Sequence, residues 1–105
     1  MKKETVKLEV KNLNSFIEKC IGLMGKNKPE NIYFETRWGI HTFFMKFPID
    51  VVVMNNNNEI VVLFKKLKPR RIVVWNPKFK RVLELKPGTI ERLRLAKKTK
   101  VQLAQ

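Results

Sequence analysis

The side chains best suited to acid–base chemistry in this chain are His41, Asp50 and Glu84. His41 and Asp50 belong to one largely apolar stretch, residues 40–54, and are the only histidine and the only aspartate. If two of the three groups shared a pocket, each would shift the pKa of the other, and they could bind a small polar ligand or support general acid–base catalysis. The structural alternative, which we favour, is a core histidine, an aspartate that accepts backbone amides beside Pro48, and a glutamate paired with a basic residue across a sheet.

Other familiar kinds of site lack the residues they need. One histidine and one cysteine, Cys20, cannot supply the three or four ligands of a zinc ion. The four glycines are isolated, so they form no glycine-rich phosphate loop, and Ser15, the only serine, stands at an expected helix start. We therefore expect no metal and no cofactor, and a binding protein rather than an enzyme.

The net charge is the strongest compositional feature. The chain has 23 Lys and Arg against 9 Asp and Glu, a formal net charge of +14. Residues 53–105 carry +11 of this charge and residues 1–52 only +3. This asymmetry favours a polyanionic partner such as nucleic acid or an anionic lipid surface. The alternative is a lysine-rich solubilising surface, which is common in proteins from hyperthermophiles.

Basic residues between 65 and 81 surround two aromatic residues, Trp75 and Phe79. Cationic side chains supply phosphate contacts that do not depend on base sequence, and an exposed aromatic ring can stack on an unpaired base. In the alternative, which we favour for this residue, Trp75 is the last core residue of its strand. The candidate polyanion-binding residues are Lys65, Lys66, Lys68, Arg70, Arg71, Trp75, Lys78, Lys80 and Arg81.

Hydrophobic patterning predicts a mainly β (α+β) fold. Residues 5–11 alternate between polar and apolar, as in a strand with one buried face. One short helix is expected from Asn14 or Ser15 to Gly25, and another from the Pro87-Gly88-Thr89 turn, with Gly88 or Thr89 as its cap. Further strands are expected at 32–37, 40–45, 51–54, 59–64, 72–75, 81–85 and 100–103. Together they predict a single compact domain, residues 1–105, that resembles a β-barrel or sandwich.

The sequence shows no recognisable export or membrane signal, so we expect a cytoplasmic protein. The first residues lack the apolar core of a secretion signal, and no window of the sequence is long and apolar enough for a membrane-spanning helix. The lone cysteine allows no internal disulfide, so an oxidising compartment is not required.

The stretch from Ile40 to Asp50, IHTFFMKFPID, resembles the signature of domain of unknown function 192, also called uncharacterised protein family 0127. Three other pieces fit in the expected order: residues 22–24, residues 67–70 and residues 82–89. The resemblance implies a compact β-rich fold. It implies no established activity, so there are no family catalytic residues to carry over.

Three function classes remain open from the sequence. Our prediction is a non-enzymatic binding module for a polyanion, with nucleic acid as the leading partner and no base-sequence specificity. One alternative is a ligand-binding or enzymatic pocket around His41, Asp50 and Glu84. The other is a protein–protein interaction or assembly domain that uses apolar strand edges.

Overall fold

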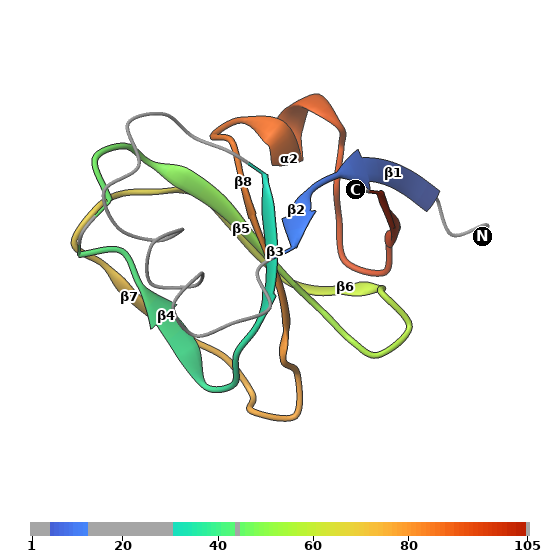
Figure 1. The fold of residues 1–105 in the computed structure, drawn as a ribbon, viewed down its shortest axis with the longest axis horizontal. Helices are drawn as coiled ribbons and strands as arrows, with labels where there is room; N and C mark the ends of the chain where they lie inside the picture. Colours follow the sequence, from blue (N-terminus) through green and yellow to red (C-terminus); the bar gives the residue numbers. More distant parts are fainter. Residues whose placement is uncertain (1–4, 13–30, 44, 105) are drawn as a thin grey trace.

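A five-stranded sheet forms the centre of the computed structural model, which describes residues 5–12, 31–43 and 45–104 (Figure 1). In spatial order its strands are β2 (Lys11–Asn12), β3 (Ile32–Glu35), β8 (Arg81–Leu85), β5 (Ile49–Met54) and β6 (Ile60–Leu67). β2 pairs with β3 in parallel, and the other neighbours are antiparallel. The mainly β fold is therefore confirmed.

β5 is the most deeply buried strand, and all six of its residues are buried. It lies between β6 and β8, so both of its edges are hydrogen-bonded and both of its faces are covered. A continuous run of valines suits such a position. The four asparagines that follow make the tight connection to β6 that the sequence predicts. Asn58 adopts a left-handed φ of 60°, and the Asn55 side chain accepts the backbone N–H groups of Asn57 and Glu59.

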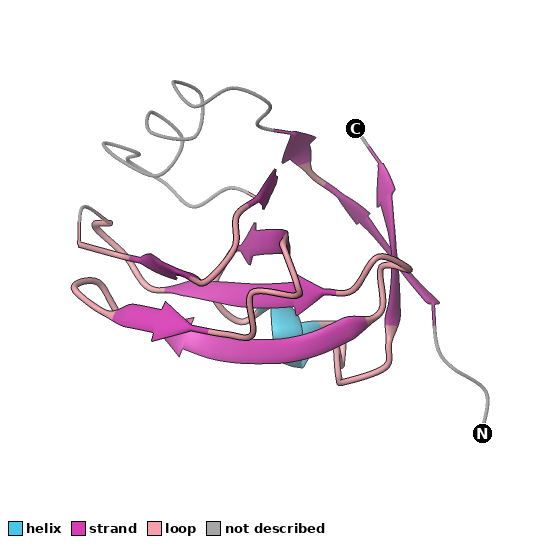
Figure 2. Cartoon of the chain, turned by 90° about the horizontal axis from the view of Figure 1, so that it is seen from below, coloured by secondary structure: helices cyan, strands magenta, loops and turns pink. Residues whose placement is uncertain are grey.

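Two smaller sheets flank the central one. β1 (Thr5–Glu9) pairs in parallel with β9 (Lys100–Ala104), and β4 (Gly39–His41) pairs antiparallel with β7 (Ile72–Val74). Figures 1 and 2 show β1 and β9 at the end of the molecule that carries the marked termini, and Figure 1 shows β4 and β7 at the opposite end.

Hydrophobic clusters lie on both faces of the central sheet. Val52 and Met54 of β5 face one cluster, which also contains residues of β1, β9 and the helix α2 (Thr89–Arg92). Val51 and Val53 face the other, against which β4 and β7 pack. The two-stranded ribbon β4–β7 and the helix α2 are therefore on opposite sides of the central sheet.

The sheets are less closed than the sequence-based prediction of a barrel suggested. Among the described residues, β2 and β6 are the two outer strands of the central sheet and do not pair with each other, so the sheet is open and the barrel half of the expected barrel or sandwich overstates its closure. The helix expected from residue 14 or 15 to residue 25 lies outside the described residues. α2 begins after Gly88, which takes a φ of 89°, whereas the Thr89 hydroxyl donates to the carbonyl of Lys86 instead of capping the helix.

Two strand boundaries also differ from prediction. The strand expected over residues 40–45 ends at His41, since Thr42 turns the chain and bonds to the loop before β7. β6 continues to Leu67, so Lys65 and Lys66 belong to a strand rather than to a connector. In the described part of the chain, no helix has the length and apolar character needed to cross a membrane.

Candidate nucleic-acid interface

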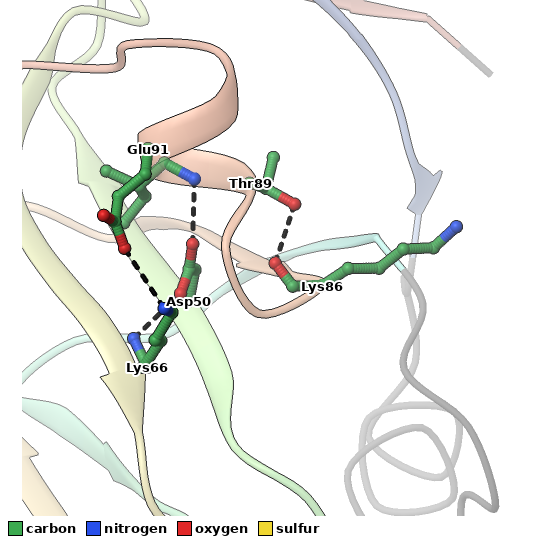
Figure 3. Close-up of polar contacts among 6 residues, drawn as sticks. Asp50, Lys66, Lys86, Thr89 and Glu91 are labelled. Atoms are coloured by element: carbon green, nitrogen blue, oxygen red, sulfur yellow. Dashed lines mark hydrogen bonds and ion pairs between the residues drawn. The ribbon is translucent and has the colours of Figure 1, made fainter.

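Asp50 has a structural role. β6 has a bulge at Lys65 and Lys66, which both lie opposite Asp50, and the bulge leaves the Lys66 N–H without a strand partner. Asp50 Oδ1 accepts this N–H at 2.8 Å, and Oδ2 accepts the N–H of Ile90, in the first turn of α2, also at 2.8 Å (Figure 3). The carboxylate is 1% exposed. It therefore joins the centre of the sheet to an irregular strand and to a helix start. The carboxylate accepts backbone amides as we expected, but they belong to β6 and α2 and not to the connection beside Pro48.

Glu84 lies on the other face of the same sheet. Its register partners are Ile32 on β3 and Val51 on β5, so it is surrounded by apolar side chains. Burial raises the pKa of the Glu84 carboxyl to about 8, and the carboxyl is therefore mostly protonated at neutral pH. The expected pairing with a basic residue across the sheet is wrong for the described residues, because both cross-strand neighbours are aliphatic.

The third candidate, His41, is exposed, so the prediction of a core histidine is also wrong. β4 turns Ile40 inward onto the core and His41 outward, where the imidazole lies 5.4 Å from the Phe43 ring. Asp50, Glu84 and His41 thus occupy one face of the central sheet, its opposite face and the outside of the β4–β7 ribbon. The structure does not bring these groups into a shared pocket.

Three of the predicted polyanion-binding residues are engaged within the fold. Lys66 lies 3.4 Å from the Glu91 carboxylate, and Lys80 lies 3.6 Å from Glu35. The Arg81 guanidinium donates to the side chain of Asn58 at 2.7 Å. These three cations therefore have protein partners that a phosphate would have to displace.

The remaining predicted cations have exposed side chains: Lys65, Lys68, Arg70, Arg71 and Lys78. Trp75, in contrast, is 7% exposed and belongs to the core. Its indole N–H donates to the carbonyl of Phe79 at 2.9 Å, so both its apolar surface and its polar atom are satisfied internally. Trp75 therefore cannot serve as a stacking surface, in agreement with the reading that we favoured.

A shallow hollow of about 300 Å³ lies on the β4–β7 ribbon. The four large hydrophobic side chains that are exposed within the described residues all line it: Trp38, Phe43, Ile72 and Val74. We call the hollow and these four side chains, together with His41, the ribbon face. Apolar groups concentrated in this way on an otherwise charged surface are typical of a binding site.

Two backbone features of β4 shape the ribbon face. Gly39 fits because a Cβ at this position would collide with the carbonyl oxygen of Val73, so the two strands approach as closely as they do only with glycine there. Trp38 takes a left-handed φ of 78°, which is costly for a bulky residue, and its indole remains 69% exposed. Its carbonyl accepts the Trp75 N–H at 2.9 Å, which fixes the backbone on which the exposed indole stands.

Thr42 attaches a cationic loop to one end of the ribbon face. Its hydroxyl donates to the Lys68 carbonyl at 2.7 Å and accepts the Arg71 N–H at 2.9 Å. Its backbone N–H donates to the Arg71 carbonyl, and its own carbonyl accepts the Arg70 N–H at 3.0 Å. Lys68, Arg70 and Arg71, which we call the cationic loop, are therefore held beside His41 and Ile72 rather than left on a free connection.

The other end of the ribbon face carries two more cations. The Arg37 guanidinium donates to the Pro77 carbonyl at 2.8 Å, and the Lys78 ammonium lies 6.0 Å from the centre of the Phe79 ring. Arg37 immediately precedes Trp38. Sequence reasoning missed Arg37, Trp38 and Phe43 as site residues, although an aromatic residue in a Trp-Gly turn was a signal that its side chain need not be buried.

Metal-binding groups do not gather in the described part of the chain. Across residues 5–12, 31–43 and 45–104, no three His, Cys, Asp or Glu side chains lie close enough to hold an ion. The exposed side chains of the ribbon face offer an apolar stacking surface between two cationic ends.

Two solved structures resemble this fold. One is a protein from Sinorhizobium meliloti proposed to be a transcription regulator, with a TM-score of 0.72 and 18% identity over 85% of this chain and 76% of the other. The second is a protein of unknown function from Novosphingobium aromaticivorans, with a TM-score of 0.70 and 15% identity over 85% of this chain and 69% of the other. At these identities the likeness is one of fold alone.

Sequence comparison identifies the family. A UPF0127 protein of Pyrococcus furiosus is 35% identical over 98 residues, which cover 88% of this chain and 84% of the relative. A UPF0127 protein of Pyrococcus horikoshii is 34% identical over 92 residues, which cover 82% and 79%. The family model DUF192, described as "Uncharacterized ACR, COG1430", matches residues 1–103. The resemblance seen in the sequence is thereby confirmed, and the chain belongs to this uncharacterised family.

Proposed function

We propose that this protein is a non-enzymatic module that binds nucleic acid through its phosphates, without base-sequence specificity, at the ribbon face. The observation that carries the proposal is the placement of cations at both ends of that face. Three of them, Lys68, Arg70 and Arg71, are in the cationic loop at one end, and Arg37 and Lys78 are at the other. A phosphate backbone that crosses the ribbon would meet positive charge on each side of the hollow.

The described segments that form this face also carry no acidic side chain of their own. The segments 37–43, 68–74 and 76–78, which form the ribbon face and its two ends, contain no Asp or Glu. Elsewhere, acidic residues neutralise nearby cations, as Glu35 does for Lys80 and Glu91 does for Lys66. A cationic surface without carboxylates attracts polyanions and orients them during encounter. A merely solubilising surface has no reason to exclude carboxylates from one face.

The description of the structural neighbour from Sinorhizobium meliloti as a transcription regulator is compatible with this proposal, but the likeness to it is one of fold alone and carries no function to this chain. The alternative of a catalytic pocket has less support, since His41, Asp50 and Glu84 lie on three different surfaces of the fold.

The test is the salt dependence of binding to a fluorescently labelled oligonucleotide. If the five cations each neutralise one phosphate, log K falls against log salt with a slope of about −3.5 for a single strand. Affinity then drops about 100-fold between roughly 50 and 200 mM salt. The double substitution Arg70→Gln and Arg71→Gln should weaken binding and flatten the slope by about 1.4.

A matched control separates a local site from general charge. Arg92 and Arg94 are also exposed, and they lie at α2, on the opposite side of the central sheet. Changing both to glutamine removes the same charge and should leave the slope nearly unchanged. No binding by the unmodified protein at about 50 mM salt, or equal losses for the two double variants, would contradict the proposal.

A further inference from the structure

We infer that the ribbon face binds an unpaired base, so that the protein binds single-stranded nucleic acid more tightly than a duplex. This inference rests on the proposed function and names the substrate class of the same site. The element that carries it is Trp38, whose indole is 69% exposed and lines the hollow. The flat surface that an unpaired base needs is absent from a site that only contacts phosphates.

The two tryptophans of the chain show that exposure of Trp38 is specific to this place. Trp75 is only four residues from the cationic loop, yet its ring is buried and its N–H is bonded to the Phe79 carbonyl. Trp38 keeps its indole outside the core and takes a left-handed backbone conformation, which a smaller residue would adopt at lower cost. Folding alone gives no reason for tryptophan here.

The neighbours of Trp38 extend the same surface. Ile72 and Val74 are 67% and 71% exposed, and Phe43, on the β4 side, is 48% exposed. In the ribbon His41 pairs with Ile72 and Gly39 with Val74, so these positions share the outward side, while Ile40 and Val73 between them pack against the core. The result is a continuous apolar surface with aromatic rings at both ends, at Trp38 and at Phe43.

Charge decides which occupant this surface fits. A partner protein without acidic groups, or an acyl chain by itself, would gain nothing from Arg37 on one side and Arg71 on the other. A nucleotide combines a flat ring with a phosphate and so matches both the rings and the cations. In a duplex the bases are stacked on each other and their faces are not available, so only a strand with unpaired bases can use the rings.

The hollow also has suitable dimensions. Its volume of about 300 Å³ is at the small end of the range typical of ligand sites, which suits one base better than a folded segment of a partner protein. It is shallow and open, so a strand can enter from the side and leave its backbone beside the cations. The surface therefore holds one or two bases, with neighbouring phosphates on the cationic loop and beside Arg37.

The experiment compares three labelled probes of about 15 nucleotides: a thymidine strand, an abasic strand of the same length, and a duplex. The unmodified protein should bind the thymidine strand most tightly, and all three probes should show salt-dependent binding. Trp38→Ala should weaken binding of the thymidine strand about 10- to 100-fold and leave the abasic strand and the duplex unchanged. Trp38→Phe, which keeps an aromatic ring, should recover most of the loss.

The controls distinguish this inference from the function on which it rests. Arg70→Gln with Arg71→Gln should weaken binding of all three probes, and far-ultraviolet circular dichroism should show that each variant is folded. If all probes bind the unmodified protein equally, or if Trp38→Ala weakens them equally, base stacking is refuted while phosphate binding stands. If no probe binds and the protein self-associates through Trp38 instead, both proposals are overturned.

Discussion

Glu84 offers a direct test of how the core of this protein is built. A carboxyl group between Ile32 and Val51 loses its hydration, and burial raises its pKa from 4.5 to about 8. The folded protein therefore retains the Glu84 proton at pH values where the unfolded chain has released it. Replacing Glu84 with glutamine keeps the shape of the protonated acid and removes the ionisation.

The size of the effect follows from the shift. Each pKa unit corresponds to about 1.4 kcal/mol, so a rise from 4.5 to about 8 makes ionised Glu84 cost the folded state about 5 kcal/mol. Because the folded-state pKa is the higher one, the contribution of Glu84 to stability is greatest below about pH 4.5 and is lost as the pH rises toward 8. At pH 7 about 3 kcal/mol of the loss is already present, and above about pH 8 it levels off.

Urea denaturation of the protein and of Glu84→Gln across this pH range measures the difference. We expect the variant to gain stability relative to the unmodified protein by about 1.4 kcal/mol per pH unit between about pH 5 and pH 8. Glu35→Gln is the control of opposite sign. The hydrogen bond from Tyr33, followed by the charge of Lys80, lowers the pKa of Glu35, so its contribution is lost as the pH falls. Parallel stability curves for the unmodified protein and Glu84→Gln would refute the burial argument.

Two further substitutions test how the structure positions its parts. Asp50→Ala leaves the part-buried N–H of Lys66 and the buried N–H of Ile90 without their charged acceptor, and we expect a loss of about 3–5 kcal/mol in urea denaturation. The exposed carboxylate of Glu91 is its control, because Glu91→Ala should change stability by less than about 1 kcal/mol, and equal losses would contradict the role given to Asp50. Gly39→Ala places a Cβ against the backbone of β7, so it should cost about 1–3 kcal/mol and weaken binding of a single strand together with stability. An unchanged denaturation midpoint for Gly39→Ala would show that the ribbon can widen without cost.

Several strands could be predicted from the sequence because their signals are local. Residues 51–54 form an uninterrupted apolar run, and residues 81–85 and 100–103 carry strand-like patterns between turn residues, so their existence does not depend on distant contacts. The pairing of the strands into sheets could not be predicted in the same way. The open sheet depends on which edges meet, and a pattern of single strands does not contain that information.

The partners of Asp50 could not be predicted from the residues next to it in the sequence. Its position after Pro48 predicted a carboxylate that accepts backbone amides of the neighbouring connection; the carboxylate does accept amides, but not those. The amides come from a bulge 16 residues away and a helix start 40 residues away, and neither partner could be named without the register of β5 and β6.

The ribbon face was the part of the candidate site that was hardest to predict from the sequence. Apolar residues at 72–74 and an aromatic pair at 43 and 44 look like core, and the sequence pointed to Trp75, with a core position favoured, without indicating Trp38 as a stacking residue. What separates the two tryptophans is that Trp75 reaches the core from the end of β7, while Trp38 turns outward before Gly39. That difference is set by one backbone angle and by packing of the ribbon on the central sheet.

The most direct test of the account is to record backbone amide shifts by two-dimensional NMR while a single-stranded oligonucleotide is added. If the ribbon face is the binding surface, the largest changes should fall on residues 37–43 and 68–75, with the Trp38 indole N–H among them. Amides of α2 and of β9 should scarcely move, since they lie beyond the central sheet. Shifts concentrated on α2 and β9, or spread evenly over the basic surface, would contradict the assignment of this face.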